Sequence, residues 1–166
     1  MNSLDSLMAT NILIYILRRY SANKLILFYR YWRSEFKLYK KSDGRYYWHG
    51  TLRPGVLPNG WAWEVAAIYN NDHPSPRMGG SVRVVLLNPS IDTVKKALGW
   101  RPHHLLTCAV DGEYLCTTRA EDMSYGGHVE TTAIQTLTWA VKWLTALELV
   151  MAGDLSPELF NRPDGI

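Results

Sequence analysis

The feature that most constrains the fold is a series of short strand-like runs between positions 36 and 87, separated by turn-forming residues. Side-chain type in these runs changes with a period of two, as expected where successive side chains point to opposite faces of a sheet. Asp43-Gly44 and the Pro and Gly residues at 54–60 predict turns. Strands joined in succession favour an antiparallel meander. We expect four strands, over 36–40, 46–52, 61–69 and 81–87.

A second hairpin is predicted by Asp111-Gly112, a strong signal for a two-residue turn. The runs on either side, 105–110 and 113–118, are strand-like and carry the two cysteines of the chain, Cys108 and Cys116. With a two-residue turn, Cys108 faces Leu115 across the hairpin, and the cysteines lie on opposite faces. In that register they form neither a disulfide nor a shared metal site.

The same register predicts different surroundings for the two thiols. Leu106, Val110 and Leu115 are expected to face the core. Cys108 would then be buried as a small hydrophobic residue, which is the usual fate of an isolated cysteine. Cys116 would lie nearer the surface, where a thiol has the access that a nucleophile needs.

Helices are predicted at both ends of the chain. Apolar residues spaced three and four apart predict a long helix over 129–152, ended by Gly153. Similar spacing predicts an N-terminal helix from Ser3 to about Tyr20, and the segment 23–31 stays ambiguous between helix and connection. We therefore expect a single α+β domain over residues 1–166.

Composition narrows the class of protein. A hydrophobic content of 47% is enough to build a core and argues against a disordered chain. The longest charge-free apolar stretch near the start, 6–17, is shorter than the roughly 20 residues of a membrane-spanning helix. Two cysteines make no disulfide framework. We expect a soluble, unprocessed cytoplasmic protein that does not associate with a membrane.

Charge is unevenly distributed along the chain. Residues 1–53 hold ten Lys and Arg against three Asp and Glu, a balance of +7, so the remainder of the chain carries −4 of the net +3. Such a segment is either a solvated surface or a docking surface for an acidic partner. The aromatic and basic run 28–33 also suggests nucleic-acid binding, but aromatic residues here more often fill a core, so we do not expect a nucleic-acid partner.

Several strings, taken in order, resemble the ubiquitin-conjugating-enzyme (UBC) family. Residues 48–54 resemble its W-x-G-x-L-x-P motif, and 112–116 its G-x-[IL]-C signature with one residue more between Gly and Cys. Further similarity lies in the predicted third strand at 61–69, in 82–89 with its final proline, and in Trp143-Leu144, Glu148 and Gly153. The similarity covers about two-thirds of the chain, and it is closest to bacterial members of anti-phage signalling operons of the CBASS type.

This resemblance implies an acyl (thioester) transferase without a cofactor or metal. Cys116 would carry the C-terminal acyl group of a protein and pass it to a lysine amine. The family's oxyanion Asn has no counterpart between 90 and 116, so His103 or His104 would be the donor, with Asp122 and His128 near the amine. The transferred protein would be a cyclic-oligonucleotide synthase, and an activating enzyme would dock on the basic N-terminal third.

Two alternatives stay open. One is a catalytically inactive interaction module with the same UBC-like fold, in which Cys116 is incidental. The other is a zinc site among five residues of suitable type, but their spacing matches no closed tetrahedral site: His103, His104, Cys108, Cys116 and His128.

Overall fold

The computed structural model describes residues 35–58, 61–71, 73, 80–117 and 133–162. The predicted N-terminal helix and the ambiguous segment 23–31 lie outside these ranges. Among the described residues, no helix combines the length and the apolar character that crossing a membrane requires.

The described part of the chain forms an α+β fold around one six-stranded sheet. Its strands lie in the order β1-β2-β3-β4-β6-β5 and all pair antiparallel. The strands are β1 (Phe36–Lys40), β2 (Tyr46–Leu52), β3 (Trp63–Tyr69), β4 (Val82–Asn88), β5 (Leu105–Cys108) and β6 (Gly112–Leu115). The helices are α3 (Ile91–Leu98), α4 (Ala133–Ala152) and α5 (Pro157–Phe160). The predicted four-strand meander and the long helix near the C-terminus are confirmed.

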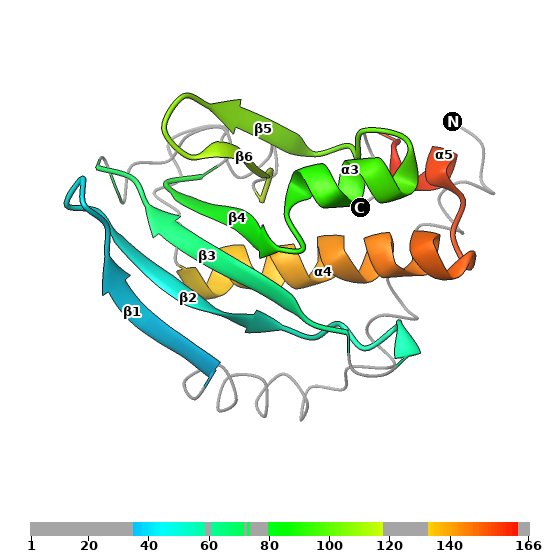
Figure 1. The fold of residues 1–166 in the computed structure, drawn as a ribbon, viewed down its shortest axis with the longest axis horizontal. Helices are drawn as coiled ribbons and strands as arrows, with labels where there is room; N and C mark the ends of the chain where they lie inside the picture. The colour runs from blue at the N-terminus through cyan, green and yellow to red at the C-terminus, as the bar shows by residue number, and fades with distance from the viewer. Residues whose placement is uncertain (1–34, 59–60, 72, 74–79, 118–132, 163–166) are drawn as a thin grey trace, which may run out of the picture.

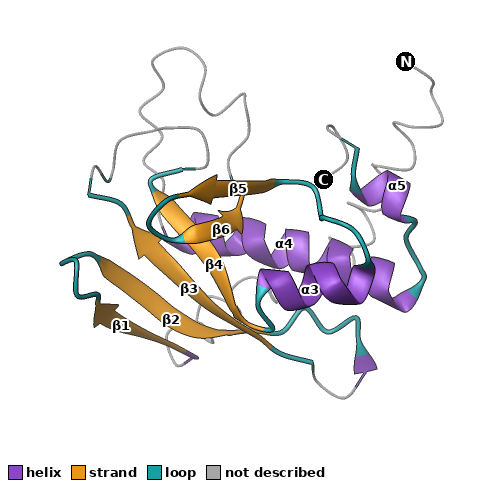
Figure 2. Ribbon diagram, turned by 45° about the horizontal axis from the view of Figure 1, so that its top comes forward, coloured by secondary structure: helices purple, strands orange, loops and turns teal. Residues whose placement is uncertain are grey.

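The helix α4 packs against one face of the sheet (Figure 1). On that face a row of paired residues crosses five strands: Trp48, Ala67, Val84, Leu115 and Leu105. All but Trp48 are buried, and the tryptophan packs against the same core. This row joins the second hairpin to the meander through the pair Val84–Leu115. The core therefore lies between the sheet and α4. The second view also has α4 lying along this face of the sheet (Figure 2).

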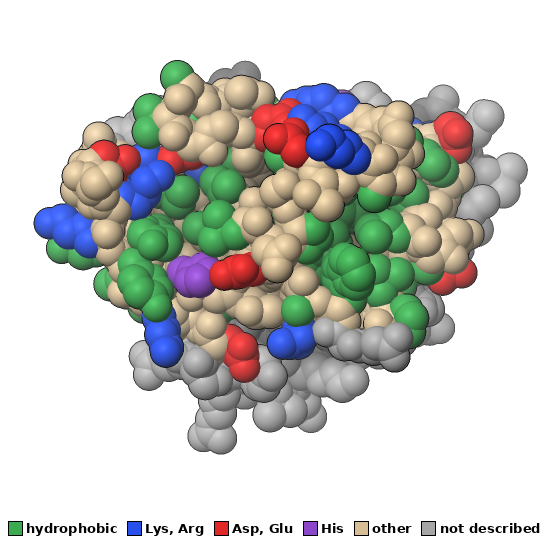
Figure 3. Space-filling view, viewed as in Figure 1, with side chains coloured by type: hydrophobic (Ala, Val, Ile, Leu, Met, Phe, Trp, Pro, Cys, Tyr) green, Lys and Arg blue, Asp and Glu red, His purple; other side chains and the backbone are tan. Residues whose placement is uncertain are grey.

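The opposite face of the sheet carries a mixture of apolar and charged side chains in the space-filling view (Figure 3). Tyr39 is 43% exposed and stacks on Tyr47, with ring centroids 5.6 Å apart. Beside them, His49 Nε2 lies 2.7 Å from Glu64 Oε1. Exposed tyrosines on a half-polar sheet face are ordinary for an antiparallel sheet with one solvated side.

Gly50 in β2 has a steric role. It pairs with Phe36 of the edge strand, and a Cβ at position 50 would lie 2.6 Å from Phe36 Cγ and 2.5 Å from the Glu35 carbonyl oxygen. Only a residue without a side chain allows this approach of β1 to β2. The glycine of the tryptophan-containing motif is thus explained by packing within the sheet.

The end of α4 follows from its sequence. Gly153 has φ +81°, and its N–H donates to the Val150 carbonyl while Asp154 N–H donates to the Leu149 carbonyl. These two bonds form a Schellman motif, which satisfies carbonyl groups left over at a helix end. The predicted end of the helix at Gly153 is confirmed.

The helix α3 was not predicted, although its signals are present. The Ser90 side chain accepts a hydrogen bond from Thr93 N, Asp92 lies in the first turn, and Gly99 closes the helix at φ +77°. An N-cap serine and a left-handed glycine are typical helix boundaries. With eight residues and only Val94 buried, the helix is too short to display a long apolar stripe.

The predicted register of the second hairpin is wrong. Cys108 pairs with Gly112 and Leu105 with Leu115, so the loop has three residues, 109–111. A type I′ turn needs positive φ at both central residues. Gly112 has φ +74°, whereas Asp111 is not among the residues with positive φ. Asp111 is therefore the last residue of a three-residue loop, and Gly112, the first residue of β6, takes the left-handed conformation directly after it.

This correction changes the surroundings of both cysteines. Val110, expected in the core, is 68% exposed. Positions 108 and 116 fall on the same face of the hairpin by alternation, and both residues are half-buried thiols without a disulfide. The expectation that Cys108 is buried in the core and Cys116 exposed is therefore wrong.

Candidate active site

Cys116 follows directly after β6. Its N–H donates to the carbonyl oxygen of His104 at 2.7 Å, which continues the pairing one step beyond Leu105–Leu115. The sequence proposed Cys116 and His104 as site residues, and this bond brings their backbones together. Cys116 is half-buried, so its thiol lies at the boundary between the interior and solvent.

The adjacent residues His103 and His104 have an unusual arrangement. Neighbouring side chains of an extended strand point to opposite faces, yet these two rings have centroids 4.6 Å apart. The cause is the backbone of His104, which has φ +56° and is the only described residue other than glycine with positive φ. Such a conformation costs about 1–3 kcal/mol and persists only where the surroundings enforce it.

Side-chain contacts from α4 and from the residue after α5 enforce this conformation. The N–H of His103 donates to Asn161 Oδ1 at 2.9 Å, and its carbonyl accepts from Trp143 Nε1 at 3.2 Å. Both backbone groups of His103 are thus held by side chains, one from α4 and one from the residue that follows α5. Sequence analysis missed Asn161 as part of the site, because nothing local links it to a residue 58 positions away.

Polar atoms around this turn are buried without partners. Within the described part of the chain, His103 Nδ1, His104 Nε2 and Thr117 Oγ1 have no hydrogen-bond partner. Thr117 is only 6% exposed and follows Cys116. Most buried polar atoms in proteins have a hydrogen-bond partner. A buried polar atom that lacks a partner is a candidate for a functional role. Thr117 is a second residue that sequence analysis missed, and a hydroxyl beside the proposed nucleophile was the available signal.

The protonation of His104 follows from its surroundings. Burial lowers its pKa below the ordinary value, the neighbouring His103 ring lowers it further, and a hydrogen bond to the Arg162 backbone partly opposes both. The net direction is downward, so His104 is a neutral imidazole at pH 7.

A second polar cluster surrounds Cys108 and Asp111. The Asp111 side chain is fully buried and binds three cations: Lys41 at 2.9 Å, Arg45 at 2.7 Å through two nitrogens, and Arg83 at 3.1 Å. Burial by itself would raise the pKa of Asp111, but these hydrogen bonds outweigh it and hold the pKa well below its usual range. Cys108 Sγ accepts from Arg83 Nη1 at 3.1 Å and from the Asp111 N–H at 3.2 Å.

This cluster includes part of the positive charge of residues 1–53. Two of the ten cationic residues in this segment, Lys41 and Arg45, bind the buried Asp111 side chain. Arg45 is buried as a whole residue. Part of the positive charge in residues 1–53 therefore serves the interior of the fold.

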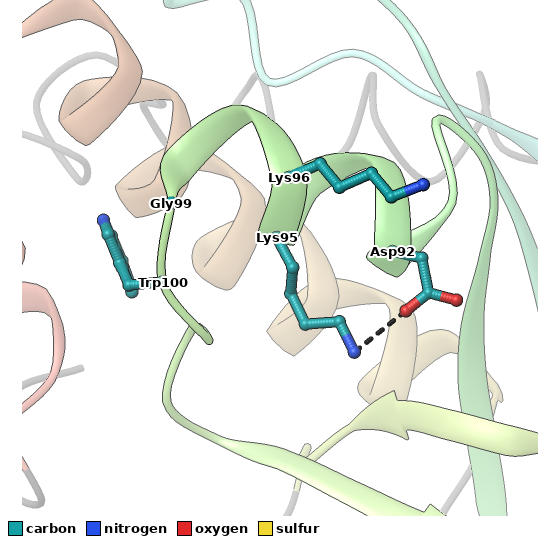
Figure 4. A pocket seen from close by; sticks show the side chains of 5 residues that line it. All are labelled: Asp92, Lys95, Lys96, Gly99 and Trp100. Carbon is teal, nitrogen blue, oxygen red and sulfur yellow. Dashed lines mark ion pairs between the residues drawn. The ribbon is translucent and has the colours of Figure 1, made fainter.

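A shallow cavity of about 520 Å³ lies beside α3, lined by Asp92, Lys95, Lys96, Gly99 and Trp100 (Figure 4). Lys95 Nζ is held by Asp92 Oδ1 at 2.9 Å and by Glu113 Oε2 at 2.6 Å. The charge of Lys95 is therefore compensated by two carboxylates.

Two further predicted site residues fall outside the part of the chain that the structure describes. Asp122 and His128 lie outside the described ranges. Among the described residues, no three His, Cys, Asp or Glu side chains gather as a metal ion would require, so the alternative zinc site finds no support there.

Comparisons with protein-family models, with curated proteins and with solved structures found no match for this chain.

Proposed function

We propose that the protein is a ubiquitin-conjugating-like transferase that carries a protein C-terminal acyl group as a thioester on Cys116. The group then passes to an amine, the side chain of a lysine on a target protein. No cofactor takes part, because the chemistry needs a positioned thiolate, a stabilised oxyanion and a base.

The observation that carries the proposal is the turn opposite Cys116. His104 accepts the Cys116 N–H at 2.7 Å, and it has a buried ring nitrogen without a partner among the described residues. Side chains of Asn161 and Trp143 bind the backbone of His103 and so hold the strained conformation of His104. Backbone strain and an unsatisfied ring nitrogen on His104, whose carbonyl accepts the Cys116 N–H, favour a catalytic role over a packing role.

The state of His104 suggests its role. A hydrogen bond to the Arg162 backbone raises its pKa, as a ring N–H does when it donates to a carbonyl oxygen. Nε2, the nitrogen without a partner, is then the lone-pair acceptor of the neutral ring. We therefore assign His104 as the base rather than as the oxyanion donor. His103 and the Thr117 hydroxyl remain as donor candidates.

The two steps balance as follows. The Cys116 thiolate attacks the carbonyl carbon of an incoming thioester, the new S–C bond forms, and the donor's C–S bond breaks to release its thiolate. The lysine nitrogen then attacks the same carbon, an N–C bond forms, and Cys116 leaves as a thiolate. The proton lost by the amine goes to His104 Nε2. The product is an amide between the two proteins.

The wider role rests on the sequence resemblance. From this resemblance we propose that the α+β fold is UBC-like and that the protein acts in anti-phage defence of the CBASS type in the cytoplasm. The transferred protein would be a cyclic-oligonucleotide synthase, and a separate activating enzyme would dock on the basic N-terminal third. Co-expression with a candidate synthase, followed by intact-mass measurement, tests that identity.

The chemistry itself is testable without the natural partner. A synthetic peptide with a C-terminal mercaptoethanesulfonate thioester serves as donor, and Nα-acetyl-lysine amide serves as acceptor. We expect wild-type protein to gain the peptide mass, to lose it with excess reductant, and to transfer it to the lysine derivative. Cys116→Ala should carry nothing, while Cys108→Ala should load as wild type does.

Variants separate the proposal from its alternative. Cys116→Ser should retain a reductant-resistant ester, because an oxygen ester resists thiols. His104→Gln should load normally but transfer to the amine about 100-fold more slowly, within the range typical of lost general-base catalysis. If Cys116→Ala still loads, or if transfer by the wild type is no faster than from a short cysteine peptide, the inactive interaction module is the better assignment.

A further inference from the structure

The segment that follows α4 is joined to the candidate site through one side chain. Asn161 follows α5 and donates its own N–H to the Pro157 carbonyl at 3.0 Å, which fixes its backbone. Its Oδ1 accepts the His103 N–H at 2.9 Å. Position 161 is thus anchored on the C-terminal helix while its side chain reaches the loop before β5.

The helix α5 is a rigid support for this contact. Phe160 is fully buried and packs edge-on against Trp143, with centroids 5.6 Å apart, and against Trp100 at 5.9 Å. Ser156 caps the helix by accepting from Leu159 N, and Pro157 begins it. Trp143 also donates to the His103 carbonyl, so one aromatic cluster supports both contacts to His103.

These contacts explain how the conformation of His104 persists. His104 adopts the left-handed conformation although it is not a glycine, so its backbone is strained. Its ring lies against the His103 ring. Fixing the N–H and the carbonyl of the preceding residue limits how the chain can rotate away. Loss of the Asn161 acceptor would leave the His103 N–H to water and allow the turn to relax.

We infer that Asn161 is a positioning residue that holds His103, and through it the left-handed turn of His104, in register with Cys116. This inference rests on the proposed function of Cys116 for its catalytic consequence, but the positioning itself is a structural statement. The helix α5 then supports the active site. Truncation of the chain before α5 would remove Asn161 and with it the support of the His104 conformation.

Three variants isolate the side-chain acceptor. Asn161→Leu keeps the volume and removes the acceptor, and Asn161→Asp keeps an oxygen at the same place. Ser156→Ala weakens the cap of α5 without touching His103, and so it is the control for helix stability. The measurements are hydrogen exchange of the His103 amide and the NMR titration of the His104 ring.

We expect Asn161→Leu to lose protection of the His103 amide and to raise the pKa of His104 toward its ordinary value of about 6.5, because the ring loses burial. Its transfer rate to the lysine derivative should fall about 10-fold with loading unchanged. Asn161→Asp should retain the protection and most of the rate, and Ser156→Ala should leave the His104 titration as in the wild type.

Two failures are distinguishable. If Asn161→Leu leaves both the His103 protection and the His104 titration unchanged in a folded protein, the positioning role is overturned. The positioning role is also overturned if Asn161→Leu lowers loading and transfer only by the fraction of the protein that is unfolded. If the titration shifts as expected but wild-type protein carries no acyl group, the proposed function fails while the positioning role stands.

Discussion

At the scale of single residues, two buried carboxylates are stabilised in different ways. Glu148 is fully buried on α4 and accepts hydrogen bonds from Val56 N at 2.9 Å, Leu57 N at 3.2 Å and Trp63 Nε1 at 2.7 Å. Asp111 is held instead by three cationic side chains. Each carboxylate needs these partners, because burying a carboxylate costs free energy unless its oxygen lone pairs accept hydrogen bonds.

The role of Glu148 gives a residue-scale prediction. Glu148→Leu leaves two amides and one indole N–H without an acceptor, and we expect the free energy of unfolding to fall by about 2–4 kcal/mol. Hydrogen exchange should show lost protection at the Val56 and Leu57 amides. Glu148→Gln retains one acceptor oxygen and should lose less. Equal stability of the Leu variant and the wild type would contradict this account.

At the scale of elements, contacts between different strands, helices and loops decide how these elements pack together. The edge strand β1 approaches β2 at Gly50, where Phe36 occupies the space of a side chain. The loop after β2 is fastened to α4 by Glu148, and α5 reaches the loop before β5 through Asn161. The strands and helices are thus joined by a few polar contacts in addition to the apolar core.

Gly50 provides the prediction at this scale. Gly50→Ala places a Cβ within 3.0 Å of backbone and of an aromatic ring, so β1 or Phe36 has to move. We expect a loss of about 1–3 kcal/mol in urea unfolding, in the range of overpacked sites. Gly44→Ala is the control: its Cβ would meet open space, and only its φ of +89° is unfavourable, at about 1 kcal/mol. A Gly50→Ala protein as stable as the wild type would show that β1 shifts freely.

For the whole molecule, Asp111 is the point where three distant segments meet. It lies in the loop between β5 and β6 and binds the β1–β2 turn through Lys41 and Arg45 and β4 through Arg83. These residues belong to both hairpins and to the strand between them. Protonation of one carboxylate would therefore weaken contacts across the sheet.

The stability of the protein should fall in acid because of Asp111. Its pKa is lowered in the folded state, so its contribution is fully present above the unfolded value of about 3.9 and is lost as pH falls through the folded value. We expect the unfolding free energy of the wild type to fall more steeply than that of Asp111→Asn below about pH 4. Chemical denaturation at several pH values measures both slopes.

Two comparisons sharpen this prediction. At pH 7, Asp111→Asn should cost about 3–5 kcal/mol, because the buried Arg45 loses its buried charge partner and keeps only the exposed Asp43. Asp43→Asn removes an exposed partner of the same arginine, at 2.7 Å, and should cost far less. Since other carboxylates also have lowered pKa values, parallel acid slopes for wild type and Asp111→Asn would overturn the assignment to Asp111.

The sequence alone predicts what depends on neighbours along the chain. Period-two alternation and Asp43-Gly44 predict the first hairpin, and apolar spacing with Gly153 predicts α4 and its end. The boundary signals of α3 are equally local, but eight residues with one buried side chain show no long apolar stripe. For the site, sequence proposes Cys116, His103 and His104 from residue type and from resemblance, and this choice stays a prediction. In the structure, the Cys116 N–H donates to the His104 carbonyl oxygen.

Only the tertiary structure decided the register of the second hairpin and the surroundings of the site. Asp-Gly is compatible with a two-residue or a three-residue loop, and the chosen loop buries Asp111 against Arg45, 66 residues away. Asn161 meets His103 across 58 residues, and Glu148 meets Trp63 across 85. Such pairs leave no periodic or local trace in the sequence, because they arise when separately formed elements pack and bury polar groups that must then find partners.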